Sequence, residues 1–273
     1  MEGLFQRVKE AVNYVKGKSD VTLRTGIVLG TGLGGLQEMV EVSDIIPYKD
    51  IPHFPVSTVD SHDGNLILGT LADVPVVIMQ GRFHYYEGYS LEQVTFPIRV
   101  MAGLGIENLI ITNAAGGMNA QYQKGDIAII TDHLNLTGQN PLVGVTDDRL
   151  GSRFPDMCQP YSEDLMSIAR SVAADQGIVI KQGVYIWAVG PCLETKAEYW
   201  YMHNAGADIV GMSTVPEVIV AVQCGLKILG LSCITDLCIP ESLHPVSLDE
   251  IIATAERTGP IMDHLIRGIV EKI

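Results

Sequence analysis

The segment Gly26-Ile27-Val28-Leu29-Gly30-Thr31-Gly32-Leu33-Gly34-Gly35 joins an apolar run directly to a glycine-rich turn. Comparable apolar runs, each ending in glycine or a small polar residue, alternate along the chain with segments of helical periodicity. The predicted strands are 26–29, 66–71, 75–79, 108–112, 127–131, 184–188, 209–212 and 228–235, and the predicted helices are 91–103, 163–176, 196–205, 218–225 and 248–272. Strands that are apolar throughout and alternate with helices indicate a twisted, mostly parallel central sheet with helices on both faces.

The whole chain, 1–273, is interpreted as a single α/β domain, because no internal repeat, low-complexity tract or Pro/Ser-rich linker divides it. One departure from parallel pairing is expected at 66–79, which has the pattern of an antiparallel hairpin turned at Asp73. The segment 136–160 is a long loop rich in Gly, Pro and Asp. Ordered loops of this length usually serve a function or an interface.

Composition restricts the functions that are open to the chain. Its 273 residues are 47% hydrophobic and 18% charged, which is enough apolar material for a large core. The net charge of −14 argues against nucleic acid or an anionic membrane as a partner. Glu217 and Lys227 interrupt the most apolar region, 215–234, so no membrane span is expected.

The cysteines and the N-terminal segment favour a reducing, cytoplasmic location. The sequence has no Cys-x-x-Cys spacing and no histidine at zinc-ligand spacing, so no metal site is expected. Cys224 and Cys233 lie in apolar runs and are expected to be buried thiols. An odd number of cysteines, and a charged amphipathic segment at 1–18 where a signal peptide would be apolar, support this interpretation.

A cluster of polar and aromatic residues, Gly81-Arg82-Phe83-His84-Tyr85-Tyr86-Glu87-Gly88-Tyr89, follows a predicted strand. The planar guanidinium of Arg82 suits an oxyanion, and His84 can donate to the same anion. Tyr86 offers a flat apolar face with a hydroxyl at its tip. Together these side chains predict a site for an anion beside a polyol or an aromatic ring. The alternative is a surface hairpin with an Arg–Glu pair.

The glycine turn at 30–35 has two possible uses. Its letters satisfy G-x-G-x-x-G, the dinucleotide-binding pattern, but Asp50, the acid about twenty residues later, sits in a proline-flanked turn and not at a strand end. We therefore favour a simpler site, in which backbone N–H groups and the Thr31 hydroxyl hold a single phosphate at a helix N-terminus.

Small residues follow two other predicted strands. The run Asn-Ala-Ala-Gly-Gly at 113–117 permits a ligand to approach the backbone closely, unless it is an ordinary glycine turn. Thr214 and Glu217 have the spacing of a helix capping box, with Pro216 in the first turn. Their structural role leaves Ser213 to face a ligand.

Two carboxylates also lie at predicted strand ends. Thr195 and Glu198 have capping-box spacing, so Glu194 has no structural role there, although it could be a solvated acid at a helix entry. Asp236 follows the predicted strand 228–235, and acids in this position commonly face the crevice beyond the sheet. The alternative for Asp236 is a cap for the segment that follows.

An ordered set of short motifs extends from about Gly26 to Ile251. The motifs are GTGLGG, GRFHYYEGY, TNAAGG, GQNPL, RFPDM, GPCLETKAE, GMSTVPEV and SCITD. Each is weak singly, but the ordered set is specific, and it resembles the trimeric purine nucleoside phosphorylase family, the sibling of the methylthioadenosine phosphorylases. The resemblance implies attack of inorganic phosphate on the anomeric carbon of a purine nucleoside, with no metal or organic cofactor.

The resemblance also implies roles for individual residues. Phosphate would be bound by Thr31, His62, Arg82, His84, Ser213 and the backbone of Ala114. The ribose and the purine would be bound by Tyr86, Leu193, Glu194, Met212, Asp236 and Leu248. The catalytic candidates are His84, Glu194 and Asp236. Phe154 would close the site of a neighbouring subunit, which implies a homotrimer.

Three residues depart from the usual pattern. Members that act on inosine and guanosine usually carry asparagine at the position of Asp236, an aromatic residue at Leu193 and a histidine near Leu248. Methylthioadenosine phosphorylases have aspartate and an apolar residue at the positions of Asp236 and Leu248, but lack the acid found here as Glu194. A methylthioadenosine or methylthioinosine phosphorylase is therefore the alternative.

Hydrogen-bond donors and acceptors sharpen the question of the substrate. A 6-oxopurine presents a donor at N1 and acceptors at O6 and N7, so it suits an ionised Glu194 and a protonated Asp236. A 6-aminopurine reverses this edge and suits a protonated Glu194. Two nearby acids in a dry pocket tend to share one proton. We therefore hypothesise activity on inosine-type and adenosine-type nucleosides.

Two other classes of protein remain as alternatives. A nucleoside-binding protein without turnover would show binding but form no product. A dinucleotide-dependent dehydrogenase would have to bind NAD. The joint presence of Thr31, Arg82, His84 and Ser213 favours the phosphorylase over both.

Overall fold

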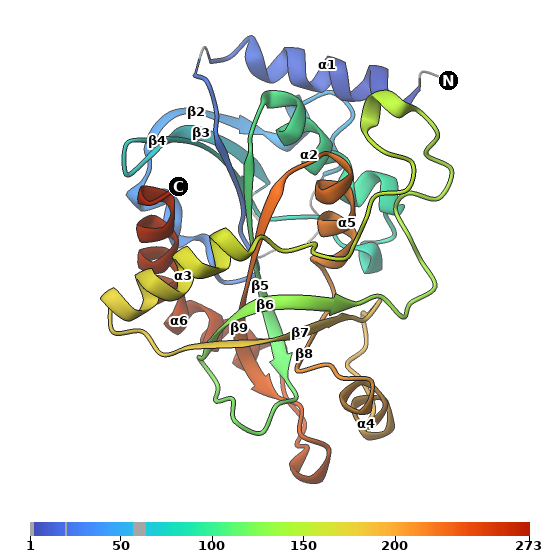
Figure 1. Cartoon of the computed structure of the whole chain (residues 1–273), viewed down its shortest axis with the longest axis vertical. Helices are drawn as coiled ribbons and strands as arrows, with labels where there is room; N and C mark the ends of the chain where they lie inside the picture. Colours follow the sequence, from blue (N-terminus) through green and yellow to red (C-terminus); the bar gives the residue numbers. More distant parts are fainter. Residues whose placement is uncertain (1–2, 20, 57–63) are drawn as a thin grey trace.

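The computed structural model describes residues 3–19, 21–56 and 64–273 (Figure 1). The strands are β1 (Thr25–Val28), β2 (Glu41–Pro47), β3 (Asn65–Leu71), β4 (Val74–Gln80), β5 (Asn108–Gly117), β6 (Ile127–Leu134), β7 (Ile180–Trp187), β8 (Ile209–Gly211) and β9 (Lys227–Leu237). The α-helices are α1 (Leu4–Lys16), α2 (Leu91–Leu104), α3 (Glu163–Asp175), α4 (Lys196–Asn204), α5 (Val215–Gln223) and α6 (Leu248–Glu271). The short 3₁₀ helices are η1 (Gly34–Met39), η2 (Tyr48–Asp50), η3 (Tyr85–Glu87), η4 (Asp148–Leu150) and η5 (Pro240–Ser242).

The described strands form one nine-stranded sheet in the order β2-β3-β4-β1-β5-β8-β7-β6-β9. Its centre is parallel, because β1 pairs in parallel with β4 and with β5, and β5 pairs in parallel with β9. Strands β7 and β8, and β6 and β7, are also parallel, whereas β5–β8 and β6–β9 are antiparallel. The pairings from β5 through β8, β7 and β6 to β9 and back to β5 therefore close into a ring. The predicted α/β class is confirmed, with a sheet more mixed than expected.

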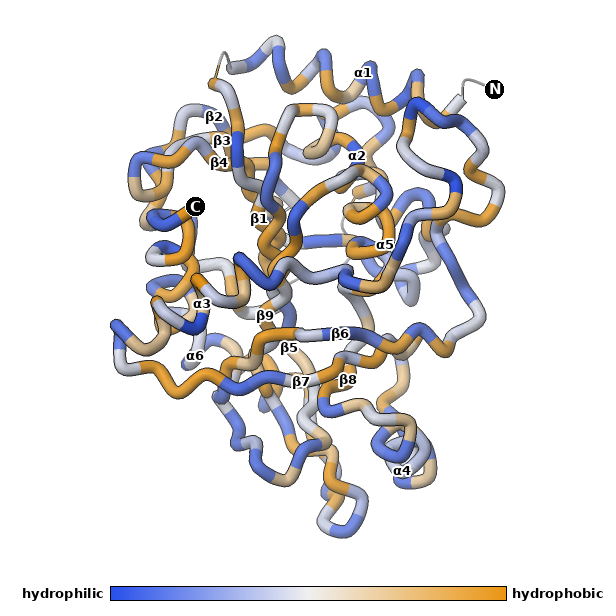
Figure 2. Tube along the Cα trace, in the orientation of Figure 1, coloured by the Kyte–Doolittle hydropathy of each residue, from blue (hydrophilic) through white to orange (hydrophobic). Residues whose placement is uncertain are grey.

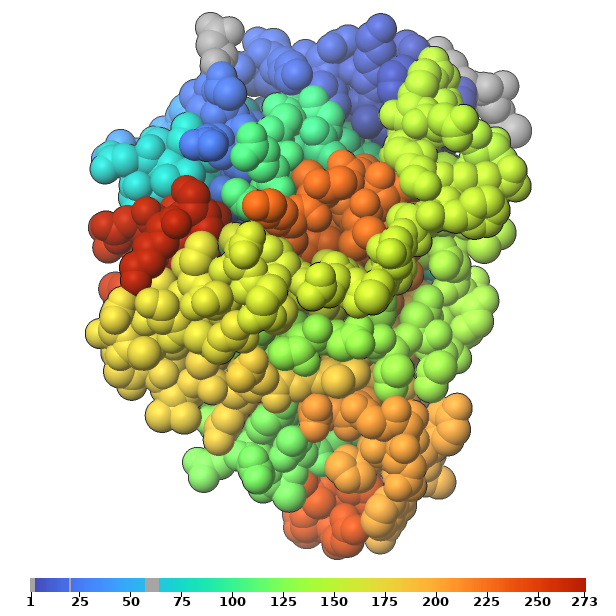
Figure 3. Space-filling view, in the orientation of Figure 1, coloured from blue at the N-terminus to red at the C-terminus, as the bar shows by residue number. Residues whose placement is uncertain are grey.

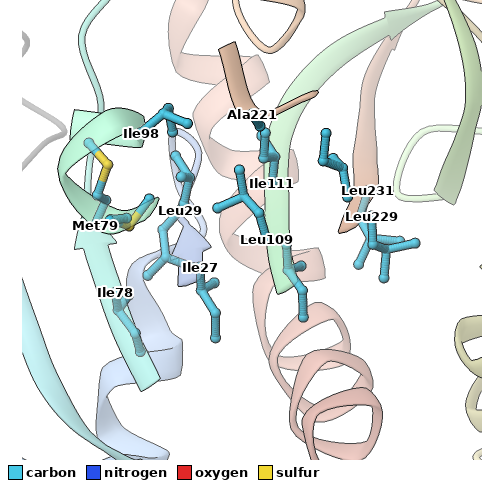
Figure 4. Packing of buried hydrophobic residues seen from close by; sticks show 14 of the residues in the cluster. Ile27, Leu29, Ile78, Met79, Ile98, Leu109, Ile111, Ala221, Leu229 and Leu231 are labelled. Carbon is cyan, nitrogen blue, oxygen red and sulfur yellow. The ribbon is translucent and has the colours of Figure 1, made fainter. Parts of the chain in front are cut away.

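The core lies between the central strands and the helices that cover them. Ile27 from β1, Leu109 and Ile111 from β5, and Leu229 and Leu231 from β9 are fully buried and lie side by side (Figure 4). Figure 2 shows these strands as largely hydrophobic traces. Helices α1, α2 and α5 pack together as one group, and α3 packs on α6 as another. Within the described residues, no helix combines the length and the apolar character that a membrane span requires.

Several predicted boundaries are corrected by pairing between strands. The strand predicted at 108–112 continues through 113–117 as β5, because this run pairs with β9 from Asn113↔Ser232 to Gly117↔Leu237, so the alternative of an ordinary glycine turn is wrong. For the same reason Asp236 lies within β9 and not beyond its end. Helix α5 begins at Val215, three residues before the predicted start. Strand β2, whose residues are mostly exposed, was not predicted.

Two other expectations have mixed outcomes. β3 and β4 form the predicted antiparallel hairpin, with its turn at Ala72 and Asp73. Both turn residues have positive φ. Cys233 is fully buried, but Cys224 is only partly buried. The long loop at 136–160 lies on the surface beside α1 (Figure 3), and the Arg149 guanidinium lies 4.1 Å from the centre of the Phe5 ring.

Candidate active site

A cavity of about 410 Å³ lies at the carboxyl ends of β1 and β4 and beside β5, β8 and β9. This is a common size for a small-molecule site. Its wall consists of Gly30, Thr31, Arg82, His84, Tyr86, Asn113, Ala114, Ala115, Gly116, Pro191, Leu193, Glu194, Tyr199, Val210, Gly211, Met212, Ser213, Thr235, Asp236, Cys238, Leu248 and Ile251. The position agrees with the rule that ligands bind outside the carboxyl ends of strands in an α/β sheet.

The glycine turn after β1 forms one edge of the cavity. Gly30 packs so closely on β5 that an added Cβ would lie 2.8 Å from the Cα of Asn113. Its N–H donates to Oγ1 of Thr112 over 3.0 Å, which fixes the turn to the neighbouring strand. The helix predicted after the turn is present, as the short 3₁₀ helix η1 and not as an α-helix. The backbone of the turn and the half-buried Thr31 still line the cavity.

Arg82 is 1% exposed and is held by groups from three segments. Its Nη1 donates to Ser213 Oγ over 2.9 Å and lies 3.3 Å from Oε2 of Glu217. Its Nη2 donates to the carbonyl of Thr112, while Nε has no hydrogen-bond partner among the described residues. The predicted alternative of a surface Arg–Glu hairpin is therefore wrong, because the partner of Arg82 is a buried acid 135 positions away.

His84 and Tyr86 lie beside Arg82. Nδ1 of His84 lies 3.0 Å from Oε1 of Glu87, which also accepts a hydrogen bond from the His84 N–H over 2.7 Å. These contacts with Glu87 orient the imidazole of His84. The Tyr86 ring stacks on the imidazole with ring centres 4.7 Å apart. Burial raises the pKa of Tyr86 to about 12, so its hydroxyl is a neutral donor and acceptor at pH 7.

The segment between β8 and α5 presents Ser213 to the cavity. Thr214 has φ 73° and ψ −57°, an unfavourable conformation for a β-branched residue. Asn113 Nδ2 donates to the Thr214 hydroxyl over 2.9 Å, and the Thr214 N–H donates to Oε2 of Glu217 over 2.8 Å. The predicted capping box of Thr214 and Glu217 is confirmed. It holds the turn so that the Ser213 hydroxyl reaches Arg82.

Two acids form another part of the wall. Asp236 is 7% exposed, and Glu194 is half-buried just before α4. Burial raises the pKa of Glu194, and the charge of Asp236 contributes in the same direction. The predicted capping box of Thr195 and Glu198 is also confirmed, which leaves Glu194 to face the cavity.

Three further wall residues, Thr235, Tyr199 and Cys238, were not singled out from the sequence. Thr235 Oγ1 donates to Asp236 Oδ1 over 2.8 Å, and Cys238 Sγ donates to Asp236 Oδ2 over 3.1 Å. The Tyr199 hydroxyl lies close to Cys238 and Glu194. Asp236 and Cys238 are separated by one residue, and in extended backbone this spacing puts both side chains on one face, which was the available signal.

The structure brings most of the predicted site residues together. Thr31, Arg82, His84, Tyr86, Ala114, Leu193, Glu194, Met212, Ser213, Asp236 and Leu248 all line the one cavity. Phe154 does not line it: its side chain is 83% exposed at a separate depression of the long loop. His62 lies outside the described residues. In the described part of the chain, no three His, Cys, Asp or Glu side chains are grouped to hold a metal ion.

The chain is similar to known proteins over nearly its whole length. The Phosphorylase superfamily model matches residues 24–271. Purine nucleoside phosphorylase 1 of Bacillus subtilis (strain 168) is 48% identical over 264 residues, which cover 97% of this chain and 97% of that protein.

Solved structures of one relative have the same fold. Schistosoma mansoni purine nucleoside phosphorylase in complex with inosine has a TM-score of 0.92 and 40% identity, and the match covers 98% of this chain and 96% of that one. The complex of the same enzyme with adenosine has a TM-score of 0.93 and 40% identity, covering 98% and 97%.

Proposed function

The chain belongs to the phosphorylase superfamily, and we propose on this premise that it is a purine nucleoside phosphorylase. It cleaves purine nucleosides with inorganic phosphate to give free purine and ribose 1-phosphate. The observation that carries this function is that a single cavity is lined both by an arginine with hydroxyl groups and by two carboxyl groups. The first set suits a phosphate and the second suits the edge of a purine. The relatives' names do not favour the alternative of a methylthioadenosine phosphorylase.

On the phosphate side, Arg82, Ser213 and Thr31 would bind the anion, together with His84 and the backbone at Ala114. Arg82 offers the buried Nε, and Ser213 is already oriented by Nη1. Since Glu217 balances the charge of Arg82 in the folded protein, the neutral donors carry part of the binding. His62 would join this site.

The reaction forms a bond between a phosphate oxygen and C1′ of the ribose and breaks the bond between C1′ and N9. The electron pair of the broken bond passes to the purine. Phosphate is a poor nucleophile and a purine anion is a poor leaving group, so positioning and charge stabilisation supply the catalysis. Tyr86 and Met212 would hold the ribose between the two sides, and Leu193 and Leu248 would border the base and the 5′ position.

On the purine side, Glu194 and Asp236 would read the base. Protonated Asp236 would donate to N7, where negative charge develops as the base leaves. A hydrogen bond made mainly in the transition state is worth a few kcal/mol. Because Glu194 has a raised pKa, one proton shared by the two acids would allow both 6-oxopurines and 6-aminopurines to bind.

The wider setting follows from the same family. The enzyme would act in cytoplasmic purine salvage, would need no metal or organic cofactor, and would assemble as a homotrimer. The exposed Phe154 supports the trimer, because a large aromatic side chain at the tip of a long loop is suited to contact a second copy of the chain.

The test of the function is the stoichiometry of the products from inosine. Hypoxanthine and ribose 1-phosphate should appear in equal amounts, and neither should form when phosphate is omitted. Free ribose in place of ribose 1-phosphate would identify a hydrolase and contradict the proposal.

A further inference from the structure

The turn between β8 and α5 has a strained conformation beside the proposed phosphate site. Thr214 has φ 73° and ψ −57°, and the Val215 N–H donates to the Ser213 carbonyl over 2.8 Å. These three residues therefore form a γ-turn of the rare positive-φ type. This conformation is unfavourable for a β-branched residue and persists only where the surrounding structure holds it. The side chains that hold Thr214 thus also determine where Ser213 lies.

The Thr214 hydroxyl lies at the centre of a chain of hydrogen bonds that leads to the cavity. Thr214 is fully buried, and its Oγ1 accepts from Asn113 Nδ2 over 2.9 Å and from Arg82 Nη1 over 3.3 Å. A hydroxyl oxygen has two acceptor positions and one proton to donate. Because both acceptor positions of Thr214 are occupied, its hydroxyl can only donate to a further group. Ser213 Oγ lies 3.2 Å away and can accept this proton.

The same count decides the direction of the Ser213 proton. Ser213 Oγ accepts from Arg82 Nη1 over 2.9 Å and from the Thr214 hydroxyl, so both of its acceptor positions are also occupied. Its own proton is then available to another acceptor. The other members of the chain are at most 2% exposed, whereas Ser213 is partly exposed and lines the cavity. The chain therefore ends in a donor at the cavity, as the binding of an anion requires.

Asn113 is held firmly in its place in this chain. In β5 it pairs with Ser232 of β9, and Gly30 packs on it so closely that an added Cβ at Gly30 would lie 2.8 Å from the Asn113 Cα. Its side-chain amide is uncharged, so it directs the hydroxyl groups without changing the charge of the site. If this donor were absent, Thr214 would have a vacant acceptor position, and Ser213 could donate to Thr214 in place of a ligand.

We propose that Asn113 is a positioning residue for phosphate, which fixes the direction of the hydrogen bonds from Thr214 to Ser213 and so keeps the Ser213 proton available to the anion. The inference rests on the proposed function, because it assigns Asn113 a part in binding the phosphate of that reaction. Asn113 transfers no proton and acts through Thr214 and Ser213. Because the donor is oriented before phosphate arrives, no binding energy is lost in turning it.

The test measures the KM for phosphate at saturating inosine in the full-length protein. In Asn113→Ala this KM should rise about fivefold, as expected for one misdirected hydrogen bond, while the KM for inosine stays within about twofold. Asn119→Ala is the matched control, because Asn119 follows the same strand and its Nδ2 donates to Asp208 over 2.9 Å, but it does not line the cavity. The control should leave both KM values unchanged.

A double-mutant cycle with Ser213 separates positioning from direct contact. Ser213→Ala removes the proton that Asn113 directs, so in that background Asn113→Ala should raise the KM for phosphate by less than about twofold. If Asn113 contacts phosphate itself, or only stabilises the site as a whole, the two effects multiply and the inference is wrong.

Neutron diffraction from phosphate-free crystals of the unmodified protein gives a second answer, which does not depend on the folding of any variant. A Thr214 deuteron directed at Ser213 Oγ supports the inference, and a Ser213 deuteron directed at Thr214 contradicts it. If the unmodified protein cleaves inosine with phosphate but Asn113→Ala leaves the KM for phosphate unchanged, the inference is wrong and the proposed function stands. If the unmodified protein forms no ribose 1-phosphate, the proposed function fails first.

Discussion

Arg82 and Glu217 form a buried ion pair in which Nη1 lies 3.3 Å from Oε2, and the two residues are 1% and 2% exposed. The same carboxylate accepts a hydrogen bond from the Thr214 N–H over 2.8 Å and so caps α5. The start of a core helix and the guanidinium of the proposed phosphate site therefore depend on one side chain.

Replacement of this carboxylate should lower the stability of the protein and strengthen its binding of phosphate. In Glu217→Gln the Arg82 charge is left buried without its partner, and breaking such a pair costs about 3–5 kcal/mol. Because a bound dianion then supplies the missing charge, phosphate should raise the Tm of the variant more than that of the unmodified protein. Glu198→Gln, which alters the exposed capping box of α4, should cost no more than about 1 kcal/mol. If urea unfolding gives the same loss in the free energy of unfolding for Glu217→Gln and Glu198→Gln, then Glu217 is not the partner that compensates the buried charge of Arg82.

The close packing of Gly30 predicts a selective effect on phosphate. An added Cβ at Gly30 would lie 2.8 Å from the backbone of Asn113, whereas at Gly34 it would meet nothing within 4 Å. Gly30→Ala should displace the turn and raise the KM for phosphate by about tenfold or more, since small misplacements of a binding group are costly. Gly34→Ala should leave this KM unchanged. A similar KM in both variants would show that the turn does not touch phosphate.

The hydrogen bonds of Asp236 predict the effect of an amide at that position. In Asp236→Asn the amide N–H₂ group donates where the carboxylate accepts, so O6 of a 6-oxopurine gains a donor and the 6-amino group loses an acceptor. The kcat/KM ratio of inosine to adenosine should rise by about tenfold, the value of roughly one exchanged hydrogen bond to a charged group. An unchanged ratio would mean that Asp236 does not contact the base at position 6.

The exposed Phe154 predicts complementation between subunits. If it closes the site of a neighbour, Phe154→Ala should raise the KM for the nucleoside without changing the fold. The double variant Glu194→Ala/Asp236→Ala should be inactive but still carry an intact Phe154. Mixed assemblies of the two, refolded together, should contain sites with the low nucleoside KM of the unmodified protein, which neither variant shows alone. Failure of the mixture, or a monomer by analytical ultracentrifugation, would remove Phe154 from the site.

The buried Asp263 on α6 predicts how stability depends on pH. Burial, with a contribution from the charge of Glu38, raises its pKa from 3.8 to about 7, and its Oδ1 has no partner among the described residues. Between these two values the unfolded chain ionises this carboxyl and the folded chain does not. Its contribution to stability is therefore complete below pH 3.8 and is lost as the pH rises to about 7.

The isosteric variant Asp263→Asn removes this titration. The Tm of the variant minus the Tm of the unmodified protein should be larger at pH 8 than at pH 5, because only the unmodified protein has the Asp263 carboxyl, whose ionisation lowers stability over this range. The matched variant Asp249→Asn alters an exposed acid of the same helix and should show no such pH-dependent difference. A constant difference for Asp263→Asn across this range would mean that the carboxyl ionises normally in the folded protein.

The fold class and most of the site could be predicted from local pattern. Continuous apolar runs such as that of β9 indicate buried parallel strands, and the carboxyl ends of such strands meet at one edge. Arg82 follows β4, Ser213 follows β8 and Asp236 lies near the end of β9. The alternation of strand and helix predicts that these strand ends converge. The two capping boxes identified Ser213 and Glu194 by showing which neighbours already have structural roles.

The remaining features depend on partners distant in sequence. The ion pair of Arg82 and Glu217 spans 135 positions, and no local pattern predicts it. The extension of β5 through its glycines exists because β9 supplies the hydrogen bonds, which overrides the tendency of glycine to end a strand. Cys238 is an ordinary core residue by sequence, and only its contact with Asp236 places it at the site.

The most direct measurement is release of the base from inosine, adenosine and 5′-methylthioadenosine, each with and without phosphate. The phosphorylase account predicts cleavage of inosine and adenosine that depends strictly on phosphate and exceeds that of 5′-methylthioadenosine. A lead by 5′-methylthioadenosine would instead identify the sibling activity, with Asp236 and Leu248 as its cause. Binding of these nucleosides without cleavage of any of them would contradict the account and identify a nucleoside-binding protein.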